Sequence, residues 1–291
     1  MAVNLKRTIL AFAAAGALAG ALATPAAHAA EQVTPPRQSW SFSGPFGKYD
    51  PAQLQRGFKV YKEVCAACHS MNLLRFRNLA EPGGPEFSLA QAAAVAAEYK
   101  IKDGPNEQGE MFERDGRIAD AFPAPFPNDA AARAANGGVL PPDMSVIAKA
   151  RTYERGFPWF VLDMFTQYQE QGPDYLTALM LGYREKPADF TMPSPTMQYN
   201  MYFPGHAIGM PPPLSNDRVT YDDGAPQTLE QYSKDVSAFL MWIAEPHLVA
   251  RKRLGFQVMI FLIVFAGLLY FTKKKVWHAV DLEPGAVEKK A

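Results

Sequence analysis

Apolar residues gather in two long runs near the ends of this chain. The first, "ILAFAAAGALAGAL" at residues 9–22, follows Lys6 and Arg7 and is itself followed by the small-x-small sequence Ala27-His28-Ala29. A basic start, an apolar run and small residues in this order are typical of a secretory signal peptide. A transmembrane helix is the weaker alternative, because the run is shorter than the ~20 residues that a bilayer requires. Residues 1–29 are therefore predicted to be a signal peptide that directs export.

The second run, "GFQVMIFLIVFAGLLYFT" at residues 255–272, contains Gln257 as its only strongly polar residue. A helix of this length spans ~27 Å, which matches the hydrocarbon core of a bilayer. It predicts a transmembrane anchor over residues 251–273, with a buried core helix as the alternative. Basic residues flank the run on both sides, so charge does not set its orientation. Export of the preceding segment does, which makes residues 30–250 periplasmic and residues 274–291 a cytoplasmic tail.

Between the runs, helical periodicity is clearest in a segment that begins at Asp50. Asp50 as N-cap, Pro51 at the first helical position and Gln53 at the third mark a helix start. Apolar residues then recur at helical spacing and lead to the two cysteines of the chain: Leu54, Phe58, Tyr61, Cys65 and Cys68. This face is expected to bring the cysteines to the core.

A second helix is predicted from Thr228, which forms a capping box with Gln231, to the residue before Pro246. Its apolar residues follow the same period: Leu229, Tyr232, Val236, Phe239, Leu240 and Ile243. Weaker helical patterns cover residues 88–99, 143–151, 158–169 and 174–182. No alternating pattern or hairpin turn indicates a β-strand. The chain is therefore predicted to be mostly α-helical.

Prolines and glycines, 25 and 21 in number, exclude a simple helical bundle. They are concentrated in "PAPFPNDA", "GGVLPPDM", "TMPSPTMQYNMYFPG" and "MPPPLSND", which are predicted to be loops. The roughly 220 residues between the two apolar runs have room for one sizeable core or two small ones. Few helices joined by long, ordered loops are expected.

Charge is distributed unevenly, although the formal net charge is zero. Residues 30–250 contain 26 Asp and Glu against 19 Lys and Arg, so the predicted exported domain is acidic. The densest stretch, residues 98–120, has seven acids and four bases. Such a field would steer a basic soluble partner through a small, salt-sensitive interface, and a solvated surface without a partner is an equal alternative. Nucleic acid is disfavoured as a partner.

Candidate chemistry centres on "CAACHSM", which contains both cysteines and places His69 directly after the second. A redox dithiol or a simple disulfide leaves the adjacent imidazole without a role. A structural zinc site needs four ligands, and the sequence has no second Cys/His cluster. Covalent haem attachment uses all three residues, because two thioether bonds hold the porphyrin and the imidazole binds its iron. Haem c is therefore favoured, with Cys65, Cys68 and His69 binding the cofactor and His69 binding the metal.

The second axial ligand is predicted from its place in a loop. Methionine and histidine are the usual choices, and methionine raises the reduction potential. Met210 is favoured, because Gly209 and three following prolines hold its backbone extended and stiff. The alternatives lie in the same proline-rich region: His206, Met192, Met197 and Met201. Four methionines in predicted helices are expected to fill the core instead: Met144, Met164, Met180 and Met241.

Several segments occur in a distinctive order: "VCAACHSM", "GGVLPPDMSVIAKAR", "YFPGHAIGMPPPL" and "YDDGAPQTLEQYSKDVSAFLMWIAEP", followed by "RKR" and the membrane run. Together they resemble the cytochrome c1 family, the haem c subunits of cytochrome bc1 complexes. The resemblance covers nearly all of residues 40–278, and the signal peptide suggests a bacterial version. It implies a cytochrome c-like haem domain with one covalent haem c, and it assigns Met210 as the distal ligand opposite His69.

Two further residues match positions that the family places near a haem propionate. They are Arg151, which ends "SVIAKAR", and Tyr175 in "PDYLTALMLGY". The alternatives are a surface ion pair for Arg151 and an ordinary core position for Tyr175.

The resemblance also implies a function and partners. The haem would accept electrons from the Rieske iron-sulfur protein and pass them to a soluble cytochrome c. The chain would be a subunit, with cytochrome b, of a dimeric ubiquinol:cytochrome c oxidoreductase that couples quinol oxidation to proton translocation. None of its residues would be catalytic, because the chain moves electrons and makes no bonds. The alternatives are a free-standing membrane-anchored monohaem carrier and a haem enzyme or sensor with an open iron site.

The segment at residues 152–172 looks longer than its counterpart in mitochondrial members of the family. Some bacterial relatives stabilise this region with an extra disulfide, but no cysteines remain for one here. Packing of its aromatic residues is therefore expected to order it: Phe157, Trp159, Phe160 and Phe165.

Overall fold

The computed structural model describes residues 33–282, with side chains to residue 278. The predicted signal peptide and the end of the predicted tail lie outside these residues. The α-helices in the described part are α2 (Pro51–Glu63), α3 (Leu89–Ala97), α4 (Asp129–Ala135), α5 (Ile147–Ala150), α6 (Trp159–Thr166), α7 (Gln171–Leu181), α8 (Leu229–Ala244) and α9 (Leu248–Leu282). Short 3₁₀ helices, η1 (Cys65–Ala67) and η2 (Phe76–Ala80), follow α2. The prediction of a mostly α-helical chain with long loops is confirmed.

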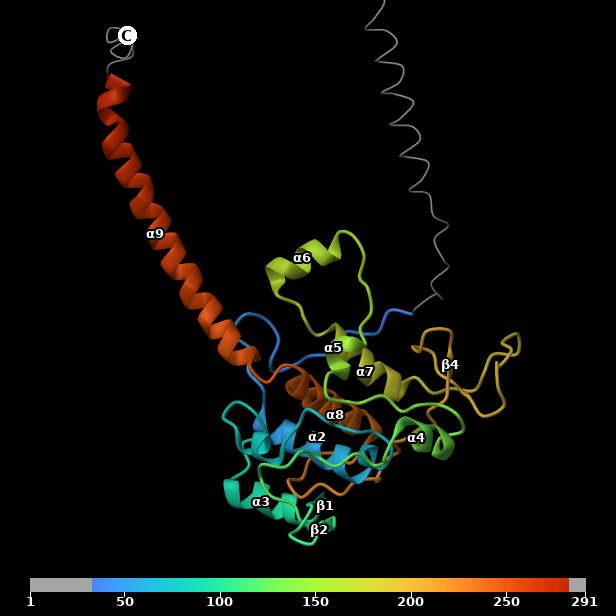
Figure 1. Cartoon of the computed structure of the whole chain (residues 1–291). Helices are drawn as coiled ribbons and strands as arrows, with labels where there is room; N and C mark the ends of the chain where they lie inside the picture. Colours follow the sequence, from blue (N-terminus) through green and yellow to red (C-terminus); the bar gives the residue numbers. More distant parts are fainter. Residues whose placement is uncertain (1–32, 283–291) are drawn as a thin grey trace, which may run out of the picture.

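The helices α2 and α8 pack side by side at the centre of the domain (Figure 1). Gly57 permits their close approach, because a Cβ atom there would lie 2.1 Å from the Asp235 carbonyl oxygen. The predicted apolar faces are buried in this contact, including Leu54, Phe58, Tyr61, Tyr232, Val236, Phe239 and Leu240. Each large apolar side chain buried in this way stabilises the fold by roughly 1.5–3 kcal/mol.

A buried carboxylate joins the same two helices. Asp235 of α8 is fully buried and accepts hydrogen bonds from Arg56 at 2.9 Å and Tyr221 at 3.0 Å. Gln53 and Gln231 donate their side-chain amides to it at 3.2 and 2.8 Å. This set of contacts, which we call the Asp235 cluster, satisfies a charge that would otherwise be costly to bury.

The predicted N-caps are confirmed, but the predicted capping box of the second helix is not. Asp50 accepts a hydrogen bond from the Ala52 N–H, and Thr228 accepts one from the Gln231 N–H. The side chain of Gln231 does not return to the cap, because the Asp235 cluster uses its amide. Satisfying a buried carboxylate outweighs satisfying one exposed N–H at a helix end.

The helix α7 packs along α8, and α5 contacts both. Gly172 at the start of α7 makes this possible, since a Cβ atom there would lie 1.6 Å from the carbonyl oxygen of Ala148 in α5. The packing fixes the loop before α5 and the loop after α7, and both contribute to the candidate site.

The weaker helical predictions are confirmed as α3, α6 and α7, with shifted ends, whereas α5 covers only Ile147–Ala150 of the predicted 143–151. The helix α4 is an addition, because "PAPFPNDA" was expected to be entirely loop. Asn128 caps α4 by accepting a hydrogen bond from the Ala131 N–H at 2.9 Å, and the alanines that follow favour the helix.

The expectation of no hairpin is wrong. The strands β1 (Lys100–Asp103) and β2 (Phe112–Asp115) form an antiparallel pair, and β3 (Gln198–Tyr199) pairs with β4 (Ala207–Ile208). The residues between β1 and β2 form a long loop instead of a two-residue turn, so the usual sequence signal is missing. Cross-strand ion pairs hold the hairpin, with Lys100 and Asp115 2.5 Å apart.

Within the described residues, α9 is the one helix long and apolar enough to cross a membrane, over Leu248–His278. None of its most apolar window is buried in the protein, which argues against the core-helix alternative. Figure 1 shows α9 extending away from the domain. The helix continues without a break past the predicted boundary at residue 273, to Leu282.

The first turns of α9 are tied to the domain by two basic side chains. Lys252 is buried and donates hydrogen bonds to the carbonyl oxygens of Phe42 at 2.6 Å and Gly44 at 2.5 Å. Arg251 donates to the side-chain oxygen of Gln169 at 2.9 Å and pairs with Glu245. The start of the anchor is therefore held by several separate parts of the chain.

The expected aromatic packing in residues 152–172 is wrong. The four aromatic side chains expected to order the segment are 50–82% exposed, and no residue of α6 is buried. Polar contacts hold the segment instead. Arg155 pairs with Asp163, and the Tyr168 hydroxyl bonds both Tyr153, at 2.8 Å, and Asp174. Met164, expected in the core, is 69% exposed for the same reason.

Candidate functional site

The Cys-x-x-Cys-His motif lies directly after α2. The helix ends at Glu63, and η1 turns the chain so that Cys65 is partly buried while Cys68 is exposed. Neither cysteine is in a disulfide. Hydrogen bonds to the Cys65 carbonyl from the N–H groups of Cys68 and His69, at 3.1 and 2.9 Å, hold the motif in one tight turn.

The imidazole of His69 is buried and has a fixed orientation. Its Nδ1 lies 2.8 Å from the Pro142 carbonyl oxygen, and donation to that oxygen leaves Nε2 as the free ring nitrogen. Burial lowers the pKa of His69 and so favours the neutral ring. A neutral imidazole oriented by a hydrogen bond at its other nitrogen is suited to bind a metal.

The loop that contains Pro142 is fastened to the motif by Asp143. Its carboxylate accepts hydrogen bonds from the Ser70 hydroxyl at 2.8 Å, from the Asn72 N–H at 2.9 Å and from the Ser145 N–H at 2.8 Å. The helical pattern predicted from residue 143 does not begin until Ile147 because these residues bond to the motif instead. Burial opposes the charge of Asp143, but the hydrogen bonds outweigh it and lower the pKa of the carboxyl.

Replacing Asp143 with asparagine is expected to reduce stability at pH 7 by about 1–2 kcal/mol, since two backbone N–H donors and a hydroxyl lose a charged acceptor. A depressed folded pKa stabilises the protein above the unfolded value and loses that effect as pH falls through the folded value. The difference between variant and wild type should therefore shrink below about pH 4. Thermal unfolding of the full chain in detergent at several pH values measures it.

The exposed Glu107, which has no ion pair among the described residues, provides the matched control as Glu107→Gln. An Asp143→Asn penalty that persisted unchanged at acid pH would show that the charge of the carboxylate is not what holds the loop.

Met210 follows β4 and is partly buried against the core. The Tyr183 hydroxyl donates a hydrogen bond to its carbonyl oxygen at 3.0 Å. The preceding Gly209 lies against Val139, where a Cβ atom would be 2.6 Å from a Val139 methyl group. The same loop therefore contacts His69 through Pro142 and the approach to Met210 through Val139.

The competing ligand candidates have other contacts. The ring of His206 stacks on Tyr199, with centroids 5.6 Å apart, and its Nδ1 lies 3.3 Å from the Asn200 carbonyl oxygen. Met192 and Met197 line a surface groove of about 510 Å³ beside Tyr199. Met201 is 39% exposed. Met241 in α8 and Met144 in the loop before α5 are both buried in the core, as expected. Met180 packs against the edge of that core.

Arg151 and Tyr175, the two propionate candidates, lie near each other. Arg151 is exposed at the end of α5, and Tyr175 is buried in α7. Burial raises the pKa of Tyr175, and the nearby positive charge of Arg151 partly offsets this effect. The neighbour Tyr183 is one that sequence reasoning missed, because nothing in its local pattern distinguishes it from a core tyrosine.

Comparison with known proteins decides the family. The model of the cytochrome C1 family matches residues 40–280. The chain is 50% identical over 262 residues to cytochrome c1 of Blastochloris viridis, covering 89% of this chain and 92% of that protein. It is 43% identical over 244 residues to cytochrome c1 of Rhodospirillum rubrum, covering 84% and 88%. The chain belongs to the cytochrome c1 family.

A further relative has a name that combines cytochrome b and cytochrome c1. The chain is 68% identical over 244 residues to cytochrome b/c1 of Bradyrhizobium diazoefficiens, covering 84% of this chain and only 35% of that protein. Membership of the cytochrome c1 family implies a haem c cofactor and an electron-transfer role as the haem-containing subunit of a cytochrome bc1 complex. It makes the chain a component of that oxidoreductase, and it does not favour the free-standing carrier.

The residues of this chain fit a covalently held haem better than a redox dithiol or a zinc site. Burial raises the pKa of the Cys65 thiol to about 12, whereas a redox dithiol needs a depressed pKa. Within residues 33–282, no group of three or more His, Cys, Asp or Glu side chains is arranged to hold a metal ion. Both thiols and the Nε2 of His69 are free for a porphyrin and its iron.

The acidic stretch at residues 98–120 presents less unpaired negative charge at the surface than its composition suggests. Four of its seven acids form ion pairs with nearby bases: Glu98, Asp103, Asp115 and Asp120. The remaining acids are exposed in and around the β1–β2 hairpin: Glu107, Glu110 and Glu113. They are the ones available to attract a basic partner.

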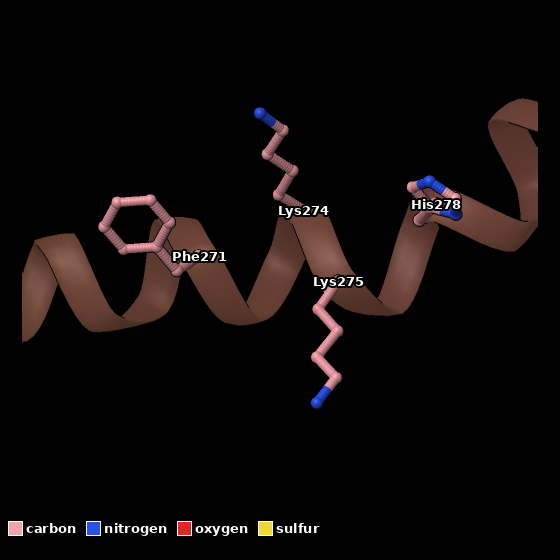
Figure 2. Close-up of a pocket in the computed structure, with 4 residues that line it drawn as sticks. All are labelled: Phe271, Lys274, Lys275 and His278. Carbon is pink, nitrogen blue, oxygen red and sulfur yellow. The ribbon is translucent and has the colours of Figure 1, made fainter.

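The far end of α9 has an aromatic and basic surface. Phe271, Lys274, Lys275 and His278 line a shallow hollow formed by this helix alone. Figure 2 shows Lys274 and Lys275 pointing to opposite sides of the helix. Such residues are typical of the membrane–water boundary, and together with family membership α9 fits a membrane-anchored protein.

Proposed function

We propose that this member of the cytochrome c1 family carries one covalently bound haem c with His69 and Met210 as axial ligands. Through it, the subunit accepts electrons from the Rieske iron-sulfur protein and passes them to a soluble cytochrome c. The observation that carries the proposal is the imidazole of His69, held by the Pro142 carbonyl directly beside two unpaired cysteines. When bound, the haem supplies a one-electron iron couple.

Each candidate residue has a distinct part in holding the cofactor. Cys65 and Cys68 attach it through thioether bonds, and their turn fixes where the neighbouring imidazole lies. Pro142 keeps the proton of His69 on Nδ1, so that Nε2 presents a lone pair to the iron. Met210 supplies a thioether, and Tyr183 holds the main chain that carries it.

Arg151 and Tyr175 serve the propionates in this proposal. The guanidinium of Arg151 supplies a positive charge close to Tyr175, as the effect on the tyrosine pKa indicates. No hydrogen bond to another described residue engages the Tyr175 hydroxyl, which leaves it free to donate to a carboxylate. A buried carboxylate is stabilised by such a pair of charged and neutral donors.

The haem domain, residues 30–250, lies in the periplasm in this proposal, on a single span through the inner membrane at residues 251–273. Residues 274–291 form the cytoplasmic tail. The signal-peptide pattern in residues 1–29 supports this orientation. Cytochrome b and the Rieske protein are the partners in a dimeric complex that oxidises ubiquinol and translocates protons. The name of the Bradyrhizobium relative, which joins b and c1, supports cytochrome b as a partner.

The denatured polypeptide is expected to keep its haem on a gel, because thioether bonds survive unfolding whereas axial bonds do not. Haem-dependent peroxidase staining at the position of this chain measures this. The double variant Cys65→Ala, Cys68→Ala is the matched control and should lose the stain. The native reduced protein should not bind carbon monoxide, because both axial positions are filled.

An unstained wild-type band would contradict covalent attachment. Binding of carbon monoxide by the native reduced protein would instead favour an open iron site and exclude the proposed pair of axial ligands.

A further inference from the structure

The helix α6 displays an apolar surface that the electron-transfer function does not use. Its exposed side chains are large: Phe157 just before it is 82% exposed, and Phe165 near its end is 81% exposed. Others lie between them, namely Trp159, Phe160, Leu162 and Met164, at 44–69% exposed. Contiguous exposed apolar side chains of this size mark an interaction site in a soluble domain.

Two charged residues of the segment, Arg155 and Asp163, are turned away from solvent. The one charged side chain within α6, Asp163, is 11% exposed and pairs with Arg155, which is 13% exposed. The Arg155 guanidinium also lies over the rings of Trp159, at 5.0 Å, and Tyr168, at 4.8 Å. The polar residues thus tie the helix to Arg155 and Tyr168 at the base of its own segment, and its apolar residues are left exposed.

Tyr168 fixes the end of the segment at residues 152–172 through several contacts. The Tyr168 hydroxyl lies 2.8 Å from the Tyr153 hydroxyl and also bonds Asp174, and Arg37 lies 3.9 Å above the Tyr168 ring. Asp174 in turn accepts a hydrogen bond from the Trp40 ring nitrogen at 2.8 Å. The outward direction of α6 is therefore set by the fold.

The segment faces the side on which the membrane anchor leaves the domain. Figure 1 shows α6 standing away from α5 and α7 on the side from which α9 extends. Gln169, three residues after the end of α6, bonds Arg251 in the first turn of α9 at 2.9 Å. The apolar run of α9 begins only four residues later, at Gly255. The end of the segment therefore lies at the level where α9 enters the bilayer.

A second aromatic contact lies at the same level. Phe46 is 71% exposed and packs edge-on against Phe256, at the start of the apolar run, with centroids 5.4 Å apart. Tryptophan favours the interfacial layer of a bilayer, because its ring combines an apolar body with a polar N–H. Phenylalanine and leucine supply the apolar face of helices that lie in that layer. Short amphipathic helices bind that layer by burying an apolar face while their polar face stays on the protein or water side.

We propose that α6 lies in the interfacial layer of the membrane, as a second lipid contact that does not span the bilayer. Trp159, Phe160 and Phe165 enter the lipid, while the Arg155–Asp163 pair stays on the inner side of the segment, next to Tyr168. The contact uses the same bilayer that α9 crosses. This contact would fix the tilt of the domain relative to the membrane plane, because α9 attaches the domain at one point and α6 adds a second.

A spin label at position 165, introduced as Phe165→Cys in the full-length holoprotein, tests this proposal. The protein is placed in nanodiscs of phosphatidylcholine and phosphatidylglycerol, and relaxation by oxygen is compared with relaxation by a water-soluble nickel chelate. The label at 165 is expected to be more accessible to oxygen, which partitions into lipid. Its native side chain is 81% exposed, so the label should not disturb the fold.

A label at position 111 is the matched control. Met111 is 64% exposed in the β1–β2 loop, on a part of the domain away from α9, and should be more accessible to the nickel chelate. Equal accessibility patterns at 165 and 111 in nanodiscs would overturn the proposal. So would a 165 label that is water-exposed in the isolated chain and protected from both reagents in the assembled complex, because another subunit would then cover α6. Haem content, measured separately, reports on the electron-transfer proposal.

Discussion

Met210→Leu is expected to lower the reduction potential of the haem by roughly 100 mV or more, because a thioether ligand raises the potential and leucine has none. The fold should survive the change. The Tyr183 hydroxyl bonds the carbonyl oxygen of residue 210, and Gly209 packs on Val139, so the main chain is held independently of the side chain. Haem should stay attached through Cys65 and Cys68. A redox titration of the purified protein measures the midpoint.

Met197→Leu is the matched control for this experiment. Met197 lies in the same proline-rich region but lines the surface groove beside Tyr199. Its replacement should leave the midpoint unchanged. An unchanged midpoint in the Met210 variant together with a lowered one in the Met197 variant would move the distal ligand to residue 197.

Asp235→Ala is expected to destabilise the haem domain by about 3–5 kcal/mol, because it removes the buried carboxylate that neutralises the Arg56 guanidinium. The loss also leaves the Tyr221 hydroxyl and the amides of Gln53 and Gln231 without their acceptor. Arg56 keeps only Asp223, at 2.7 Å, whose side chain is 44% exposed. Urea unfolding of the full chain in detergent, followed by the haem spectrum, measures the change.

Asp222→Ala removes an ion pair of the same type from the surface. Asp222 is 84% exposed and pairs with Lys59 at 2.8 Å, on the same helix as Arg56. Such exposed pairs contribute at most about 1 kcal/mol. Comparable losses in the two variants would mean that the Asp235 cluster does not hold α2 to α8.

Local signals in the sequence predicted the helix starts well. Asp50 and Thr228 cap α2 and α8 because an oxygen side chain at the first turn satisfies exposed N–H groups whatever lies elsewhere. The side chain of Gln231 could not be predicted in this way. It bonds Asp235, whose burial depends on how two helices distant in sequence cross. Contacts of this kind are set by tertiary packing and leave no local pattern.

The aromatic residues of α6 show a second limit. A sequence rich in phenylalanine and tryptophan predicts burial, and burial within the same chain was the natural expectation. The structure exposes them because the ion pair and the tyrosine hydroxyls take the inner positions. Periodicity reports that a face is apolar, but it does not report whether protein or another medium covers it.

The candidate site also contains residues that the local sequence predicts and residues whose role depends on tertiary contacts. Spacing alone predicts Cys65, Cys68 and His69 as haem-binding residues. The stiffness of its loop only favours Met210 over four alternatives, and the resemblance to the family assigns it as the distal ligand. Pro142 and Asp143, which orient His69, were noted only as part of a proline-rich loop. Their role depends on a contact across more than seventy residues, with Asp143 accepting from Asn72 and Ser70. Residues that bind a cofactor can be recognised by a local sequence motif. Residues that position them can be recognised only from contacts in the folded structure.

Hydrogen bonds from Lys252 to the carbonyl oxygens of Phe42 and Gly44 restrict how the domain can move relative to α9. A rotation at the start of α9 would break both hydrogen bonds to a buried ammonium group, so the domain and the first turns of α9 move as one rigid unit. In the proposed function, a gap between the haem and a partner that is too wide for electron tunnelling would then have to be closed by movement of the donor or the acceptor.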